Sequence, residues 1–280
     1  MSYIDLHIHS TASDGTDTPT QIVQKAAKLG LAAIAVTDHD SVSGVAEAVQ
    51  AGKEYGVEVV PGIEVSSDYR DENVHILGYF IDIDAPAMRP VLDWVKVERM
   101  DRNVKLVEMF QRDGFDISME ALLREYPGSV LGRPHFCEYL MHKGYISTVK
   151  EGFDKYLGEG KPYYLPKRRI SIATAVETIV GAGGVPVLAH PFMYHYSKPE
   201  IIELIETVKD LGIRAVEAYY SEFSDEQTEW LLRAAEKYGL GVSGGSDYHG
   251  PRKPHIAIGT GCNNLAIPYS VLENLRKLRG

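Results

Sequence analysis

The sequence predicts an α/β fold in which strand–helix units build a parallel sheet, interrupted by one helical insertion. Short apolar runs alternate with amphipathic stretches in the first and last thirds of the chain, which is the pattern of βα units. Between them this rhythm breaks, and residues 84–169 are typical of helices and richer in charge. With 280 residues, the chain is long enough for one α/β barrel of about 250 residues with an insertion.

The elements before the insertion follow from capping and breaking residues. A first strand is expected at Tyr3 to Leu6, and the first helix begins at Thr18-Pro19, because Thr caps a helix and Pro suits its first turn. Gly30 ends this helix. The elements expected next are a strand at 32–37, a helix at 42–55 and strands at 57–61 and 74–81.

The insertion and the last third complete the predicted fold. Helices are expected in the insertion at 87–112, 118–126, 134–143 and 147–157. After Ser171, helices are expected up to residue 180, at 199–211, at 225–238 and from 270 onward. Strands are expected between them at 185–189, 215–218 and 241–244. We therefore expect seven strands, with 1–83 and 170–280 forming the main domain and 84–169 covering its mouth.

Composition excludes several classes of protein. The chain has 29 Lys and Arg against 39 Asp and Glu, a net charge of −10, so a broad surface for duplex DNA is not expected. A small anionic substrate at one locally positive place remains compatible with this charge. No signal peptide and no membrane partner are expected. Cys137 and Cys262 form no CxxC pair, which argues against a disulfide framework and favours a cytoplasmic protein.

Histidines and carboxylates gather at the ends of the predicted strands. In a closed parallel barrel, the carboxyl ends of the strands meet on one face, where such folds carry their chemistry. One residue is an exception, because His75 lies within the fourth strand. The residues at or after strand ends are His7, His9, Asp14, His39, Glu64, His190, Asp247 and His249.

The spacing and type of these residues indicate a metal site. Residues two apart on an extended chain point to the same side, so His7 with His9, and Asp247 with His249, can face one pocket. Imidazole and carboxylate together suit Zn, Mn or Fe better than Ca. Nine candidate ligands exceed the needs of one tetrahedral ion, so their convergence implies two or three ions, with Glu64 as a bridging carboxylate.

The segments Asp5-Leu6-His7-Ile8-His9-Ser10, Thr37-Asp38-His39-Asp40 and Gly245-Ser246-Asp247-Tyr248-His249 resemble the PHP (polymerase and histidinol phosphatase) family of metal-dependent phosphoesterases. The resemblance covers nearly the whole chain, with the motifs in family order. It implies a distorted (β/α)7 barrel with three divalent ions, which are Mn, Fe or Zn. By this resemblance the ions are held by His7, His9, Glu64 and Asp247, by Glu64, His75 and His190, and by Asp14, His39 and His249.

The resemblance also implies a reaction. Asp14, where some branches have His, and the insertion between His75 and His190 resemble the branch of 3′,5′-nucleoside bisphosphate phosphatases. The expected activity is hydrolysis of a small phosphorylated substrate, the 3′-phosphate of a 3′,5′-bisphosphonucleotide, by a hydroxide bridging two ions. The alternatives are a 5′-3′ exonuclease on short single-stranded RNA, a cyclic phosphate phosphodiesterase, a histidinol phosphate phosphatase, and a structural metal-binding PHP module without activity.

Further roles are expected around the metal ligands. Asp247 is expected to receive or relay a proton, and His195 is a candidate for protonating the leaving group. Cationic side chains would hold the substrate phosphates, since a planar guanidinium binds phosphate through two hydrogen bonds. The candidates for substrate binding are Arg133, His135, Lys167, Arg168 and Arg252, although such side chains are more often simply solvated.

Overall fold

The fold was analysed in a computed structural model that describes residues 2–166 and 168–279. The chain forms two compact units, Met1–Val91 with Arg169–Gly280, and Leu92–Arg168. Helix α3 (Met88–Arg112) runs across the boundary between them. The sequence analysis places the insertion at 84–169, and its position over the barrel mouth stays a prediction.

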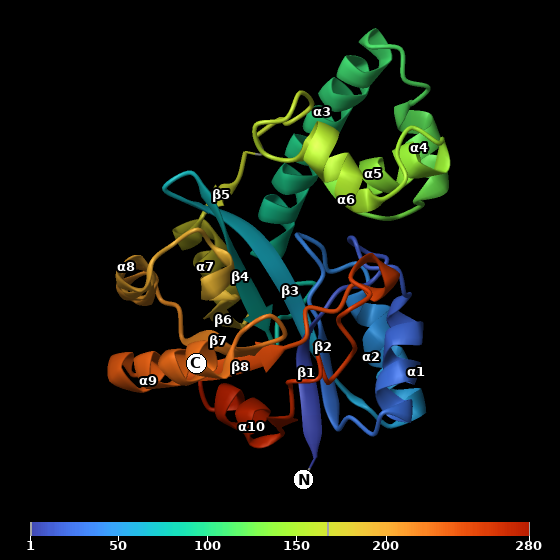
Figure 1. The fold of residues 1–280 in the computed structure, drawn as a ribbon. Coiled ribbons are helices and arrows are strands. Elements are labelled where there is room, and N and C mark those ends of the chain that lie inside the picture. The colour runs from blue at the N-terminus through green and yellow to red at the C-terminus, as the bar shows by residue number, and fades with distance from the viewer. Residues whose placement is uncertain (1, 167, 280) are drawn as a thin grey trace. The chain divides into compact units, whose positions relative to one another are not determined.

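The first unit is built on a curved, mostly parallel sheet (Figure 1). Seven of the strands in the described residues match the seven that the sequence predicts, and two short strands are added at its sides. Strand β5 (Ile170–Ser171) runs beside β3, and β9 (Ile267–Pro268) pairs with β1. The seven main strands are β1 (Tyr3–Ile8), β2 (Ala33–Val36), β3 (Glu58–Tyr69), β4 (Glu72–Tyr79), β6 (Val185–Leu188), β7 (Ala215–Tyr220) and β8 (Gly241–Gly245).

The sheet closes between its first and last main strands. The backbone N–H of Asp247 donates to the oxygen of His7 at 2.8 Å, and that of His9 donates to the oxygen of Tyr248 at 2.9 Å. Gly245 lies beside His7 at this seam, where a side chain would have no room. The predicted α/β barrel class is therefore confirmed, as a nearly closed barrel-like sheet.

One strand runs against the predicted parallel order. Strands β3 and β4 form an antiparallel hairpin, and β4 also pairs antiparallel with β6. The hairpin turns at Arg70 and Asp71, whose φ angles of 53° and 67° are those of a type I′ turn. Because β4 is reversed, its first half, with His75, lies beside Ser66 of β3. The position of His75 within a strand therefore follows from the direction of that strand.

Helices cover the outside of this sheet (Figure 1). Helix α1 (Pro19–Lys28) shows how the sequence specifies them: the Thr18 hydroxyl accepts from the N–H of Gln21, whose side chain accepts from the N–H of Thr18. Its buried face includes Ile22, Val23 and Ala26. The other helices of this unit are α2 (Val45–Tyr55), α7 (Ile172–Gly181), η2 (Pro191–Met193), α8 (Lys198–Asp210), α9 (Asp225–Tyr238), η3 (Gly250–Arg252) and α10 (Ser270–Arg276).

The interior of the barrel is apolar below the ends of the strands that carry the predicted site. Ile4, Leu6, Leu77 and Val187 are fully buried there. Tyr79 is also fully buried, and its hydroxyl is 2.9 Å from that of Ser243, so its polar atom has a partner. Burial of this apolar surface is the main stabilising contribution to the barrel.

The second unit is helical and has its own core. Phe110 and Phe136 are fully buried in it, and the ring of Phe110 stacks on Tyr163 with a centroid distance of 3.9 Å. After α3 its helices are α4 (Met119–Glu125), α5 (Arg133–His142), α6 (Val149–Gly152) and the π-helix η1 (Phe153–Leu157). Along the described residues, no helix combines the length and apolarity that a membrane span requires.

Candidate metal centre

All nine residues that the sequence predicts as metal ligands lie together at one end of the barrel. They come from the ends of β1, β2, β6 and β8, from the loop after β1 and from the interiors of β3 and β4. Their nitrogen and oxygen atoms form four overlapping groups, and the atoms of each group lie within 4.8 Å of one another. The groups are His9, Asp14, His39 and His249; His7, Glu64 and His190; His7, His9 and Asp247; and His39, Glu64 and His75.

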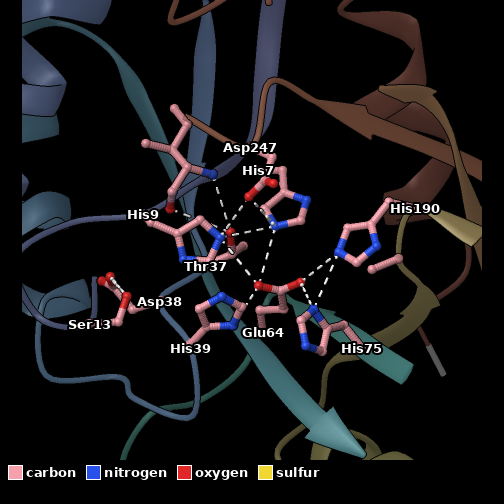
Figure 2. Close-up of polar contacts among 12 residues, drawn as sticks. His7, His9, Ser13, Thr37, Asp38, His39, Glu64, His75, His190 and Asp247 are labelled. Atoms are coloured by element: carbon pink, nitrogen blue, oxygen red, sulfur yellow. Dashed lines mark hydrogen bonds and ion pairs between the residues drawn. The ribbon is translucent and has the colours of Figure 1, made fainter. Parts of the chain in front are cut away.

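Glu64 lies at the centre of the cluster (Figure 2). Its Oε1 is 2.8 Å from His75 Nδ1 and 3.0 Å from His190 Nε2. Its Oε2 is 2.8 Å from His39 Nδ1 and 3.2 Å from His9 Nε2. The side chain is 1% exposed. Because its two oxygens face different imidazoles, this carboxylate has the placement of a bridging ligand.

A second carboxylate faces the two histidines of β1. Asp247 Oδ1 is 3.1 Å from His9 Nε2 and 3.5 Å from His7 Nε2, and the two Nε2 atoms are 3.1 Å apart. Asp247 has φ = 56°, in the left-handed region, which is uncommon for a residue with a side chain and clusters at functional sites.

The third carboxylate, Asp14, comes from the loop after β1. Its Oδ1 is 3.3 Å from His249 Nε2, 3.8 Å from His9 Nδ1 and 4.0 Å from His39 Nε2. Asp38 holds this loop, because its carboxylate accepts from the hydroxyls of Ser10 and Ser13 at 2.6 Å each. Figure 2 shows Ser13 and Asp38 beside the cluster.

The charges of the cluster keep its carboxylates ionised. Burial alone would raise the pKa of the Glu64 carboxyl, but the imidazoles of His39, His75 and His7 hold that pKa well below its usual value. Burial also opposes the ionisation of Asp14. The imidazoles of His249 and His39 nevertheless hold the pKa of this carboxyl well below its usual value. Burial lowers the pKa of His39 to about 4 against the attraction of these carboxylates. Ionised carboxylates and a neutral imidazole are the protonation states that bind metal.

Several ligand atoms of the cluster lack the hydrogen bonds that buried polar atoms normally make. They are His9 Nδ1, His39 Nδ1, His190 Nδ1 and Glu64 Oε2, and burying such atoms without a partner is costly. His39 Nδ1 and Glu64 Oε2 are only 2.8 Å apart yet make no hydrogen bond. Divalent ions bound in the cluster would satisfy these atoms, and mixed imidazole and carboxylate ligands suit Zn, Mn or Fe. The residues present therefore fit divalent metal ions.

The structure also places residues at the cluster besides the nine predicted ligands. The hydroxyl of Tyr220 and the Nζ of Lys253 both donate to Asp247 Oδ2, at 2.7 and 2.6 Å. Glu217 is fully buried beside His7. A carboxylate within the otherwise apolar run Ala215–Tyr220 was the signal in the sequence that could have identified it.

The predicted residues outside the metal ligands lie in several places. Arg252 donates to the backbone oxygen of Asp14, which puts it at the edge of the cluster. His195 is exposed between η2 and α8, and its role stays a prediction.

The other predicted substrate-binding residues belong to the second unit or lie outside the described residues. Arg133 donates to the oxygen of Leu157 at 3.3 Å, and Arg168 pairs with Glu98 at 2.9 Å. His135 is 1% exposed, and its Nδ1 accepts from the N–H of Gly132, so it caps α5. Lys167 lies outside the described residues. Contact of these residues with a substrate stays a prediction.

Comparison with known proteins identifies the class. The PHP domain family matches residues 5–157, which is more than half of the chain, and the chain belongs to this family. A 5′-3′ exoribonuclease of Haemophilus influenzae is 34% identical over 88% of this chain and 90% of its own length. A 3′,5′-nucleoside bisphosphate phosphatase of Chromobacterium violaceum is 34% identical over 90% of this chain and 88% of its own length.

A solved structure gives the same class. A Bifidobacterium adolescentis protein described as a metal-dependent phosphoesterase has a TM-score of 0.89 and 29% identity, covering 100% of this chain and 96% of its own. The chain is thus a PHP-domain phosphoesterase, which hydrolyses phosphate ester bonds and uses divalent metal. The alternative of a purely structural metal-binding module is not supported, since relatives matched over most of their length are enzymes.

Proposed function

We propose that this protein removes the 3′-phosphate from 3′,5′-bisphosphonucleotides. The observation that carries the proposal is the convergence of six histidines and three carboxylates at one barrel end, in a chain that is 34% identical to a 3′,5′-nucleoside bisphosphate phosphatase over 90% of its length. A small substrate with two phosphate groups also suits a site with cationic side chains at its edge.

Three divalent ions, which are Mn, Fe or Zn, would occupy the cluster. Following the family resemblance, one ion would be held by His7, His9, Glu64 and Asp247, a second by Glu64, His75 and His190, and a third by Asp14, His39 and His249. In support, each histidine lies within 4.0 Å of a carboxylate of its own set. When bound, such ions supply a nucleophile at neutral pH and neutralise charge on the phosphoryl oxygens. All nine residues are proposed as ligands on this geometry.

The remaining groups act through hydrogen bonds and charge. Asp247 is proposed to receive or relay a proton, and the bonds from Tyr220 and Lys253 to its Oδ2 hold the carboxylate in place for this role. Arg252, beside Asp14, is placed to neutralise a substrate phosphate. Leaving-group protonation by His195 and phosphate binding by Arg133, His135, Lys167 and Arg168 are part of the same proposal.

Hydrolysis of short single-stranded RNA is the second candidate. It is favoured by the exoribonuclease of H. influenzae, which is 34% identical to this chain and covers a similar share of it. In both reactions the attacked phosphorus atom is bonded to the 3′-oxygen of a nucleotide, so the same metal cluster would serve either. The leaving group is the 3′-hydroxyl of a 5′-mononucleotide in both reactions. The difference is that in RNA the attacked phosphorus also carries the rest of the chain.

A phosphate-release screen with added Mn²⁺ tests the proposal. The substrates are a 3′,5′-bisphosphonucleotide, histidinol phosphate, a cyclic phosphate and a short RNA with a 5′-phosphate. We expect the bisphosphonucleotide to yield a 5′-monophosphate, a chelator to abolish this activity, and metal addition to restore it. Release of mononucleotides from RNA, with the bisphosphonucleotide left intact, would favour the second candidate.

A pair of histidine variants provides the control. His9→Ala removes a residue that contacts both Glu64 and Asp247, and we expect activity to fall at least 100-fold, in the range seen when a catalytic group is removed. His142→Ala changes an exposed histidine paired with Glu125 on the second unit, and we expect full activity. Full activity in His9→Ala would contradict the proposed metal centre.

A further inference from the structure

Glu217 is a fully buried carboxylate that the proposed reaction does not use. It lies on β7, inside the barrel wall, and is 0% exposed. Its two oxygens contact two different candidate ligands: Oε1 is 2.9 Å from His7 Nδ1, and Oε2 accepts from the backbone N–H of His190 at 2.9 Å. Both oxygens of Glu217 are therefore within hydrogen-bond distance of residues of the metal cluster.

The first contact determines which nitrogen of His7 can bind metal. A neutral imidazole carries one hydrogen, on either nitrogen. A carboxylate only accepts hydrogen bonds, so Glu217 requires the hydrogen of His7 to be on Nδ1. The lone pair of His7 is then on Nε2, which faces Glu64 and Asp247 at 3.5 Å each.

The second contact fixes an unusual backbone conformation. His190 has φ = 22° and ψ = 59°, which a residue with a side chain adopts only when its surroundings enforce it. The bond from its N–H to Glu217 is such a constraint. This conformation directs the ring so that Nε2 lies 3.0 Å from Glu64 Oε1.

We propose that Glu217 is a positioning residue that holds the ligands of two ions at once, by fixing the tautomer of His7 and the backbone of His190. This inference rests on the proposed metal ligation by these histidines. It predicts that the first and second ions are both bound more weakly when Glu217 is changed, although Glu217 is not itself a proposed ligand of either ion. The third group, with Asp14 and His249, does not contain either histidine.

Glu217→Gln is the informative variant because it has nearly the same shape and removes one acceptor. A Gln side chain has one accepting oxygen and one donating NH₂ group, so it cannot accept from both His7 and His190. If its NH₂ faces His7, the hydrogen of that ring moves to Nε2, and that nitrogen no longer binds metal. The matched control is Glu58→Gln. Glu58 is the first residue of β3 and also accepts two hydrogen bonds, which come from Tyr269 and Arg276.

The measurements are Zn²⁺ binding and the state of the His7 ring. In competition with a chromophoric chelator we expect Glu217→Gln to bind Zn²⁺ at the first two positions about 10–100-fold more weakly, the usual effect of losing such a partner. The control should match the wild type. In the wild type with Zn²⁺ bound, ¹⁵N NMR of labelled histidines should show His7 with its hydrogen on Nδ1.

The outcomes separate this inference from the proposed function. If the wild type binds no Zn²⁺, the metal centre itself is wrong. If it binds Zn²⁺ and Glu217→Gln binds equally tightly, the role of Glu217 is wrong. If the variant does not fold, the wild-type spectrum still decides, because a His7 ring that carries its hydrogen on Nε2 with Zn²⁺ bound would overturn the inference.

Discussion

The closure of the barrel can be tested by adding a single methyl group at Gly245. An ideal Cβ at this position would lie 2.3 Å from the backbone nitrogen of His7, 2.4 Å from its Cβ and 2.8 Å from its Cα. Real Cβ atoms essentially never come closer than 3.0 Å to such atoms. The obstructing atoms belong to strand β1 and cannot rotate away, so Gly245→Ala must push β1 and β8 apart.

The size of the effect follows from these distances. Moving the nitrogen of His7 from 2.3 Å to an ordinary contact of 3.4 Å requires a separation of roughly 1 Å. The hydrogen bond from Asp247 N–H to the His7 oxygen, now 2.8 Å, would then be broken. Overpacking costs about 1–3 kcal/mol, and a buried unpaired donor costs a further 1–3 kcal/mol. We therefore expect the barrel to lose roughly 3 kcal/mol.

Calorimetry is the suitable assay because it measures the melting temperature directly. A loss of about 3 kcal/mol lowers the melting temperature of the barrel by roughly 6–12 °C for a chain of this size. Metal retention should fall too, since His7 and Asp247 lie on opposite sides of the seam. Gly132→Ala is the control, because its nearest neighbours are 3.5 Å and 3.8 Å away and its φ is −122°. A Gly245→Ala barrel that melts within about 2 °C of the wild type would refute the reasoning.

Three further predictions concern separate parts of the chain. Asp14→Ala, which removes the carboxylate facing His249, should lower bound metal by about one ion per chain in elemental analysis, and an unchanged content would exclude Asp14 as a ligand. Cys262 is exposed, whereas burial raises the pKa of the Cys137 thiol to about 12, so a thiol reagent should label one cysteine quickly in the native protein and two in denaturant. Two fast thiols in the native protein would contradict the buried site. Phe110→Ala empties a fully buried position and should destabilise the second unit by about 3–5 kcal/mol, seen as earlier proteolysis within 92–168; unchanged proteolysis would argue against that core.

The sequence predicted the strand–helix units because the main strands are short apolar runs between amphipathic helices, and the barrel was implied by the family resemblance. The antiparallel β4 was missed for a local reason. The hairpin between β3 and β4 turns at Arg70 and Asp71, both with positive φ, without the Asn or Gly that usually marks such a turn. The predicted third strand therefore ended at Pro61, whereas β3 continues to Tyr69 and carries Glu64 in its interior.

The candidate ligands were predictable because they are chemically distinctive and close to strand ends. Their partners were less visible, since they are defined only by contacts across the barrel: Glu217 contacts His7 from 210 positions away along the chain. The substrate residues of the second unit were chosen from their charge and from the ability of guanidinium groups to bind phosphate, neither of which shows what a side chain contacts in the fold. His135, for example, caps α5 through its contact with Gly132, and its role in substrate binding stays a prediction.

The cluster also shows why this barrel end cannot be explained by stability alone. Glu64 and Glu217 are buried carboxylates placed against imidazoles, and replacing buried ionic groups by apolar ones is often neutral or stabilising. A few ångströms away, the interior holds Leu6 and Leu77, fully buried and apolar, so an apolar end was available to this fold. Polar groups that break the rules of a core are expected at functional sites. Here the buried polar groups are carboxylates and imidazoles that face one another, and bound divalent cations would offset the cost of burying them. The same cations are the ones that phosphate ester hydrolysis uses.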